Sequence, residues 1–213
     1  SLNQALHDKD TEVRLAAAAS LIAQGVVPPL AALLPHLTRN GKAMPVRLGQ
    51  ILRDYCERDP EAVVATVRDR AIHPFIRAKA VETLAANGNP AHVSAIQPLV
   101  LSPEPDLRAA ALRAFAKLPN PRSQDAIAMC LRDESWFVRA AAADTAGRLG
   151  LYELVPLLVP LVDDEEWWVR FRASEALETL DAAGRAALRE MAKIGSDRQR
   201  QQAALTLSKT EAA

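Results

Sequence analysis

The chain has 213 residues, of which 49% are hydrophobic and 24% charged, so it can form a packed core and is unlike a disordered chain. Basic and acidic residues number 26 each, and this zero net charge disfavours a strongly basic nucleic-acid binder. Two cysteines, Cys56 and Cys130, are too few for a disulfide framework or a zinc site, and the apolar run 151–162 is shorter than the roughly 20 residues that span a bilayer.

One pattern recurs along the chain: an aliphatic residue, then arginine, then an alanine-rich stretch with helical periodicity. The copies lie about 31 residues apart, at Arg14, Arg47, Arg77, Arg108, Arg139 and Arg170, and a weaker seventh copy is at Arg198. Residues three and seven positions after each arginine share one helical face, which predicts a core of small and then larger side chains. The second copy has Asp54 at the later position, so we expect its helix to shift register and bury Leu48, Ile51 and Leu52.

A second set of helices is predicted between the arginine helices, bounded by glycine and proline turns. Its members are the segments 26–38, 60–71, 90–101, 123–132, 151–163 and 181–194. We name this set the A helices and the arginine helices the B helices. The chain shows no alternation with a period of two residues, so we expect no sheet.

A two-helix unit of this length buries its apolar face only by stacking on its neighbours. We therefore predict an all-α fold, an α-solenoid wound as a right-handed superhelix of about six to seven repeats. We expect a single repeat domain over 1–213, with a partial first repeat at 1–25 and a polar C-terminal cap at 196–213. The incomplete first helix and the non-methionine start lead us to expect a fragment of a longer protein.

The motif consists of an aspartate, a valine-arginine pair whose arginine lies six residues after the aspartate, and an alanine three residues after the arginine. This motif resembles the HEAT repeat. The similarity is greatest to the short bacterial form found in phycobilisome-lyase HEAT-like repeats, and the segments 131–149 and 161–180 carry it best. The resemblance implies the fold but not the function, because function on such scaffolds lies in surface sites. A composition rich in alanine, with arginine well above lysine, is typical of a bacterium with a GC-rich genome.

In the family, aspartate and arginine at this spacing imply a structural ladder along the turns between helices. The aspartate would accept hydrogen bonds from amides that open the B helix, and the arginine would bridge to the next repeat. The alternative is a column of arginines that binds phosphates, which the zero net charge disfavours. The ladder residues are Asp8, Arg14, Asp133, Arg139, Asp164 and Arg170.

Aromatic residues precede the ladder arginines at equivalent positions: Trp136, Trp167 and Trp168, with Phe75 and Phe137. The preferred interpretation is burial against the neighbouring repeat, and the alternative is that the tryptophans are exposed anchors for a partner. The acidic run 163–166 is interpreted as capping the following helix, since negative charge is favourable at a helix N-terminus.

The resemblance implies that B helices line the concave side of the solenoid. If the third and seventh residues after each arginine face the core, the second, fifth and ninth share the opposite face. This groove is small and apolar in the first repeats, where it includes Leu52 and Cys56. Later it is charged, with Lys79, Glu82, Arg113, Lys117, Asp144, Arg148, Arg172 and Glu175. A partner helix or peptide of mixed charge fits such a surface, although a merely solvated face is equally compatible.

No catalytic motif, phosphate-binding loop, metal-ligand spacing or cofactor motif is present in the sequence. The favoured hypothesis is a non-catalytic scaffold in the cytoplasm that binds a partner protein or peptide, in trans or from the same longer chain. Two alternatives remain. One is a regulatory domain of a larger enzyme or membrane protein. The other is a ligand or nucleic-acid binder similar to HEAT-like lyases or DNA glycosylases. Nucleic acid is the less favoured partner, and no direct membrane insertion is expected from this segment.

Overall fold

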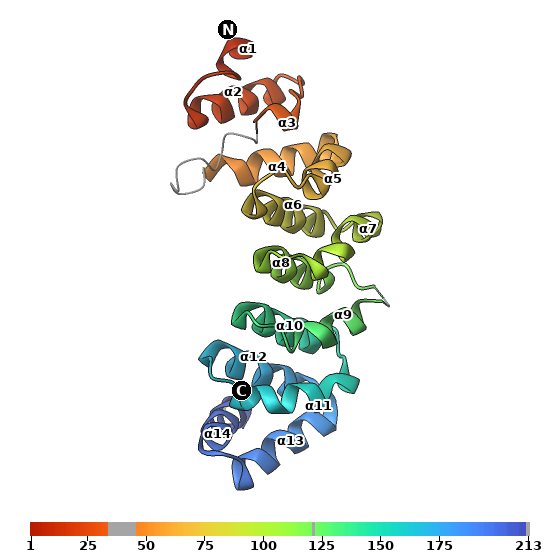
Figure 1. Ribbon diagram of the computed structural model, residues 1–213, viewed down its shortest axis with the longest axis vertical. Coiled ribbons are helices and arrows are strands. Elements are labelled where there is room, and N and C mark those ends of the chain that lie inside the picture. Colours follow the sequence, from red (N-terminus) through yellow and green to blue (C-terminus); the bar gives the residue numbers. More distant parts are fainter. Residues whose placement is uncertain (34–45, 121, 212–213) are drawn as a thin grey trace. The chain divides into compact units, whose positions relative to one another are not determined.

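The computed structural model describes residues 1–33, 46–120 and 122–211, and these residues form helices and turns without a strand. The chain divides into two compact units, Ser1–Leu99 (unit 1) and Val100–Ala213 (unit 2). Within each unit, B helices alternate with A helices, and the A helices other than α13 are short or broken into 3-10 segments (Figure 1). The predicted all-α solenoid of two-helix repeats is confirmed.

Unit 1 contains the first three arginine helices. Its elements are α1 (Leu2–Ala5), α2 (Thr11–Ala23), α3 (Leu30–Leu33), α4 (Val46–Arg58), α5 (Pro60–Arg68), α6 (Pro74–Asn87), the 3-10 helix η1 (Pro90–His92) and α7 (Val93–Ile96). Helix α6 ends at Gly88, whose φ of 79° places it in the left-handed region that glycine adopts without a Cβ penalty. Residues 34–38 of the predicted helix 26–38 lie outside the described residues.

Unit 2 contains the later repeats, and the 3-10 helix η2 (Gln97–Leu101) crosses the boundary at its start. Its further elements are α8 (Pro105–Phe115), α9 (Ser123–Cys130), α10 (Trp136–Arg148), η3 (Tyr152–Leu154), α11 (Val155–Leu158), η4 (Val159–Asp163), α12 (Trp167–Thr179), α13 (Asp181–Ile194) and α14 (Asp197–Glu211). Helices α8, α10 and α12 lie side by side in chain order (Figure 1). The predicted helix 151–163 is split into α and 3-10 segments because Pro156 and Pro160 have no N–H to continue the helical hydrogen bonds.

The cores follow the predicted positions after each arginine. In α10 and α12 these positions hold Ala142, Ala146, Ala173 and Leu177, all fully buried. Small side chains on α10 let α12 approach closely, and Leu177 fills the remaining space. In the second repeat Leu48, Ile51 and Leu52 are buried, as the shifted register predicts.

The seventh repeat differs from its prediction. With Arg198 as the repeat arginine, Gln201 and Leu205 would be core residues, but both are exposed. Ala203, three positions after Arg200, is fully buried, and Gln202 and Thr206 are buried beside it. Arg200 Nη1 donates to the Gly195 carbonyl at 2.7 Å, as other repeat arginines do to their own turns. Arg200 is therefore the repeat arginine, and the register of α14 is two residues later than predicted.

Candidate interaction surface

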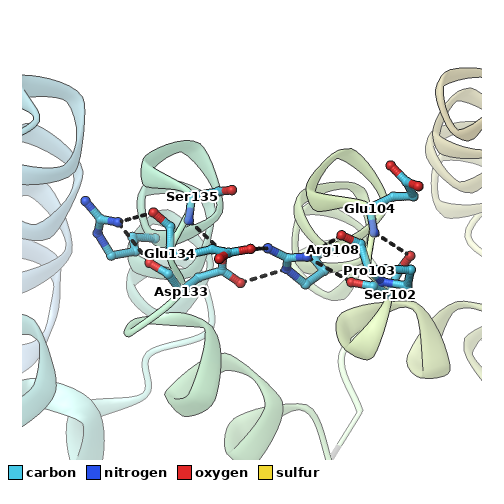
Figure 2. Close-up of polar contacts among 8 residues, drawn as sticks. Ser102, Pro103, Glu104, Arg108, Asp133, Glu134 and Ser135 are labelled. Carbon is cyan, nitrogen blue, oxygen red and sulfur yellow. Dashed lines mark hydrogen bonds and ion pairs between the residues drawn. The ribbon is translucent and has the colours of Figure 1, made fainter.

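The turns that precede the B helices of unit 2 are joined by arginine–aspartate pairs. Arg108 donates from Nε and Nη2 to the two carboxylate oxygens of Asp133, at 2.7 and 2.8 Å, while its Nη1 donates to the carbonyls of Ser102 and Pro103 (Figure 2). Each guanidinium thus holds its own turn through carbonyls and the next turn through a carboxylate. Such bidentate contacts are among the strongest and most directional of protein hydrogen bonds.

The next repeat has the same geometry. Arg139 donates from Nε and Nη2 to Asp164 at 2.8 and 2.9 Å, and from Nη1 to the carbonyls of Asp133 and Glu134. Each aspartate also accepts a hydrogen bond from the amide two residues later, at the start of its B helix: Asp133 from Ser135 and Asp164 from Glu166. Every polar atom of this arrangement has a partner within the protein.

Two opposing effects act on the pKa of Asp133. Burial raises the pKa of the carboxyl, whereas hydrogen bonds from Arg108 and from the Ser135 amide, together with the nearby positive charges, lower it. The net pKa lies below the usual value, so the carboxylate is the stable form at neutral pH.

The ion pairs join residues 25 apart in the sequence, not the residues six apart that the motif pairs. At the spacing of six the contact is through the backbone, with Arg14 donating to the carbonyl of Asp8 and Arg170 to that of Asp164. Sequence reasoning missed Arg108 as a ladder residue, although a search for arginine followed by aspartate 25 residues later would have found it. The Arg108 and Arg139 guanidiniums are fully engaged within the protein. These two side chains therefore do not form a column that binds phosphates.

The aromatic residues that precede the ladder arginines are more exposed than expected. Trp136, Trp167 and Trp168 are 40%, 44% and 49% exposed, so the preferred interpretation of burial is wrong for all three. Trp167 stacks on Phe171 with ring centroids 5.1 Å apart, and Trp168 packs edge-on against Trp167 at 4.8 Å. Both contacts are local to residues 167–171, at the start of α12. Trp136, Trp167 and Trp168, with Phe137 and Phe171, form what we name the aromatic patch.

The acidic run 163–166 takes three roles. Asp164 binds Arg139 and accepts a hydrogen bond from the amide of Glu166, Asp163 accepts a hydrogen bond from the Ser196 hydroxyl at 2.8 Å, and Glu165 and Glu166 are exposed beside the aromatic patch. The capping interpretation is not confirmed, because the N-cap residue of α12 is Glu166 and this helix has no capping hydrogen bond from a side chain.

The charged residues expected in a groove are divided between the units, and several pair with one another. In unit 1 Lys79 pairs with Glu82 on α6 at 2.7 Å. In unit 2 Arg113 and Lys117 are exposed in and after α8. Leu52 and Cys56, placed on the groove face of the earlier repeats, are buried, because the shifted register of α4 turns that face inward.

A network of four charged residues covers the adjoining faces of α10 and α12. Asp144 accepts from Arg148 at 2.8 Å and from Arg172 at 3.3 Å, and Arg172 also donates to Glu175 at 3.0 Å. The sequence placed these four residues on one surface, and the structure brings them into direct contact.

This network lines a pocket of about 430 Å³. The floor is formed where Gly147 of α10 meets α12, since a Cβ at Gly147 would lie 2.9 Å from the Ala176 Cα. The lining residues are Asp144, Gly147, Arg148, Arg172, Glu175, Ala176, Glu178, Thr179 and Thr206. Glu178 and Thr206, which lies on α14, were not identified from the sequence.

In the parts of the chain that the structure describes, no three histidine, cysteine, aspartate or glutamate side chains are arranged to hold a metal ion. Over the same residues, no helix is both long enough and apolar enough to cross a bilayer.

A family model described as HEAT repeats matches residues 67–145 and 126–208. No curated protein matches the sequence. Among solved structures, the complex of CpcE and CpcF of phycocyanin lyase from Nostoc sp. PCC7120 is similar, with 17% identity, a TM-score of 0.55 and coverage of 95% of this chain and 73% of that one. A designed armadillo repeat protein in complex with the peptide (KR)4 has 16% identity, a TM-score of 0.53 and 97% coverage of both chains. At these identities the similarity describes the fold.

Proposed function

We propose that this chain, which belongs to the HEAT-repeat family, is a non-catalytic scaffold that binds a partner protein or peptide through the B-helix surface of unit 2. The observation that carries the proposal is the exposure of Trp136, Trp167 and Trp168. Burying a large aromatic side chain contributes about 1.5–3 kcal/mol, a gain that these partly exposed rings realise only in part in the isolated chain. Clustered exposed aromatics are typical of interaction sites, where tryptophan is enriched among the residues that dominate binding.

The aromatic patch continues into the charged network along α12. Positions 168, 172, 175 and 179 follow each other at helical spacing, so Trp168, Arg172, Glu175 and Thr179 share one face. A partner lying along this face would meet aromatic side chains at one end and paired charges at the other. This combination suits a peptide with an apolar anchor and a polar continuation.

Further groove residues extend the proposal. On α8 and just beyond it, Arg113 and Lys117 offer positive charge, and in unit 1 Lys79 and Glu82 offer a charged pair on α6. We assign Arg113 and Lys117 a secondary part in binding at unit 2, because exposed charges contribute less than a desolvated aromatic anchor, and we propose Lys79 and Glu82 as a separate contact on unit 1.

The designed armadillo protein, whose structure contains the peptide (KR)4, supports a peptide as the occupant. It shows that a stacked helical scaffold of similar fold can hold a basic peptide. The exposed carboxylates of Glu165 and Glu166 beside the aromatic patch would favour a basic partner here too.

The proposal can be tested by display selection of random peptides against the full chain. Selected peptides should bind Trp136→Ala/Trp168→Ala at least about thirtyfold more weakly, the effect of losing about 2 kcal/mol at a binding hot spot. Tyr152→Ala is the matched control, because Tyr152 is an exposed aromatic residue of η3 outside the patch. If the selected peptides bind the double variant as tightly as the unmodified chain, the aromatic patch is not the binding surface.

A further inference from the structure

The pocket at the C-terminal ends of α10 and α12 contains a carboxylate that the protein does not neutralise. Glu178 lines the pocket, and its Oε2 is shielded from solvent without a hydrogen-bond donor. A carboxylate oxygen that has lost its water and gained no donor is costly, because an unsatisfied buried polar atom loses about 1–3 kcal/mol or more when charged. A donor in the pocket would recover part of that loss once the Glu178 side chain rotates and brings this oxygen to the pocket surface.

The other charges of the pocket are already matched. The Arg148 guanidinium is bound to Asp144, and the Arg172 guanidinium to Asp144 and Glu175. Counting three carboxylates against two guanidiniums, the lining has one unmatched negative charge, that of Glu178. The two arginines are therefore not an excess of positive charge that would repel a cation.

The nearest neutral polar group also offers an acceptor. Thr179 donates its hydroxyl proton to the Ala176 carbonyl at 2.9 Å, so toward the pocket it presents only lone pairs. Glu178 and Thr179 are adjacent in sequence and both line the pocket. Glu178 and Thr179 therefore present acceptors to a ligand that donates.

We propose that this pocket receives the cationic side chain, lysine or arginine, of a bound partner segment, with the Glu178 carboxylate as its counter-ion. The proposal rests on the proposed function, since the side chain belongs to the partner held by the aromatic patch. Its ammonium or guanidinium supplies the donors that Glu178 and Thr179 lack, and a volume of about 430 Å³ accommodates the end of either side chain.

The helix fixes the spacing between the two contacts. Glu178 lies eleven residues after Trp167 on α12, about 16 Å along the helix axis at 1.5 Å per residue. An extended segment covers this distance in about five residues. A partner segment should therefore carry its basic residue about five positions from its apolar anchor.

The test is an NMR titration of the full chain with the tripeptide acetyl-Gly-Lys-Gly-amide, with the uncharged norleucine analogue as the matched ligand. The lysine peptide should give saturable shifts at the Gly147, Ala176 and Thr179 amides, and the norleucine peptide should not. Glu178→Gln keeps the shape of the side chain but removes its charge, and it should weaken lysine-peptide binding about tenfold. Glu153→Gln, at an exposed glutamate of η3 outside the lining, should bind like the unmodified chain.

The probe has no apolar side chain for the aromatic patch, so its outcome is separate from that of the display selection. Absence of shifts at these amides, equal shifts with norleucine, or unchanged affinity in Glu178→Gln would each overturn the pocket assignment while leaving the scaffold proposal standing. Conversely, failure of the display selection with a positive titration would remove the aromatic patch and retain a cation-binding pocket.

Discussion

Removing the guanidinium of Arg139 should destabilise unit 2 far more than removing an equally close surface guanidinium. Arg139→Met leaves the Asp164 carboxylate, only 9% exposed, without its bidentate partner, and leaves two turn carbonyls without a donor. Breaking a buried pair by removing one partner costs about 3–5 kcal/mol. We expect about 3 kcal/mol, because Asp164 keeps the hydrogen bond from the Glu166 amide.

Arg148→Met is the matched control. Arg148 and Asp144 are also 2.8 Å apart, but the Arg148 side chain is 63% exposed. A solvent-exposed pair contributes about 0–1 kcal/mol, so this variant should lose less than about 1 kcal/mol. The comparison keeps the closest nitrogen–oxygen distance and the substitution constant, and it changes the burial of the pair together with the number of hydrogen bonds that the guanidinium makes.

Urea unfolding followed by tryptophan fluorescence measures the effect where it occurs. The sequence has three tryptophans, and all three lie on α10 and α12, so the signal reports on unit 2. In Arg139→Met/Asp164→Asn no buried charge is left unpaired, and the double variant should be more stable than Arg139→Met alone. A loss in Arg139→Met no larger than in Arg148→Met, or no recovery in the double variant, would refute the argument that burial makes the ladder strong.

Three further predictions concern other residues of unit 2. The folded-state pKa of Asp133 is depressed, so the stability that the carboxylate contributes is complete above its unfolded pKa near 4 and is lost as the pH falls through the folded value. Urea unfolding between pH 6 and 3 should therefore show that the free energy of unfolding falls less steeply with pH in Asp133→Asn than in the unmodified chain. An identical dependence on pH in the two proteins would contradict this. Gly147→Ala should lower the free energy of unfolding by about 1–2 kcal/mol in the same assay, despite the higher helix propensity of alanine, because the new Cβ would lie 2.9 Å from the Ala176 Cα. A variant more stable than the unmodified chain would show that α12 can move aside. Burial, with a smaller effect of Asp133, raises the pKa of Cys130 to about 11, so about one thiol in a thousand is ionised at pH 8. In Cys56→Ser, which leaves Cys130 as the single thiol, Ellman's reagent should therefore modify the protein only upon unfolding. Rapid modification of the folded variant would show that the Cys130 thiol is accessible.

The fold was predictable because the repeat period and the helical period act on the same residues. Arginines about 31 residues apart give the repeat length, and small residues three positions later identify the buried face; Ala142 and Ala173 are both fully buried. The same logic allowed the deviation in the second repeat to be predicted, since Leu48, Ile51 and Leu52 form an apolar face that Asp54 does not interrupt. It failed in α14, where polar residues surround both candidate arginines and only Ala203 distinguishes the registers.

Exposure of the tryptophans was not predictable from helix position. Trp136 and Trp167 occupy the first residue of their helices, where a side chain can pack on the preceding turn or project into solvent. Which occurs depends on what covers the turn from the neighbouring repeat, and a single sequence does not specify that contact. Glu178 escaped prediction for a related reason, because its pocket is completed by Thr206 from a helix whose register was wrongly assigned.

The ladder and the proposed binding surface are physically connected through the same turns. Asp133 and Asp164 each lie three residues before a tryptophan, and the carbonyls that follow them are held by Arg139 and Arg170. The hydrogen bonds therefore fix the backbone from which Trp136 and Trp167 project, although they do not touch a ligand. A rigid platform reduces the entropy lost when a partner orders these rings, so the ladder would support affinity by positioning the aromatic patch.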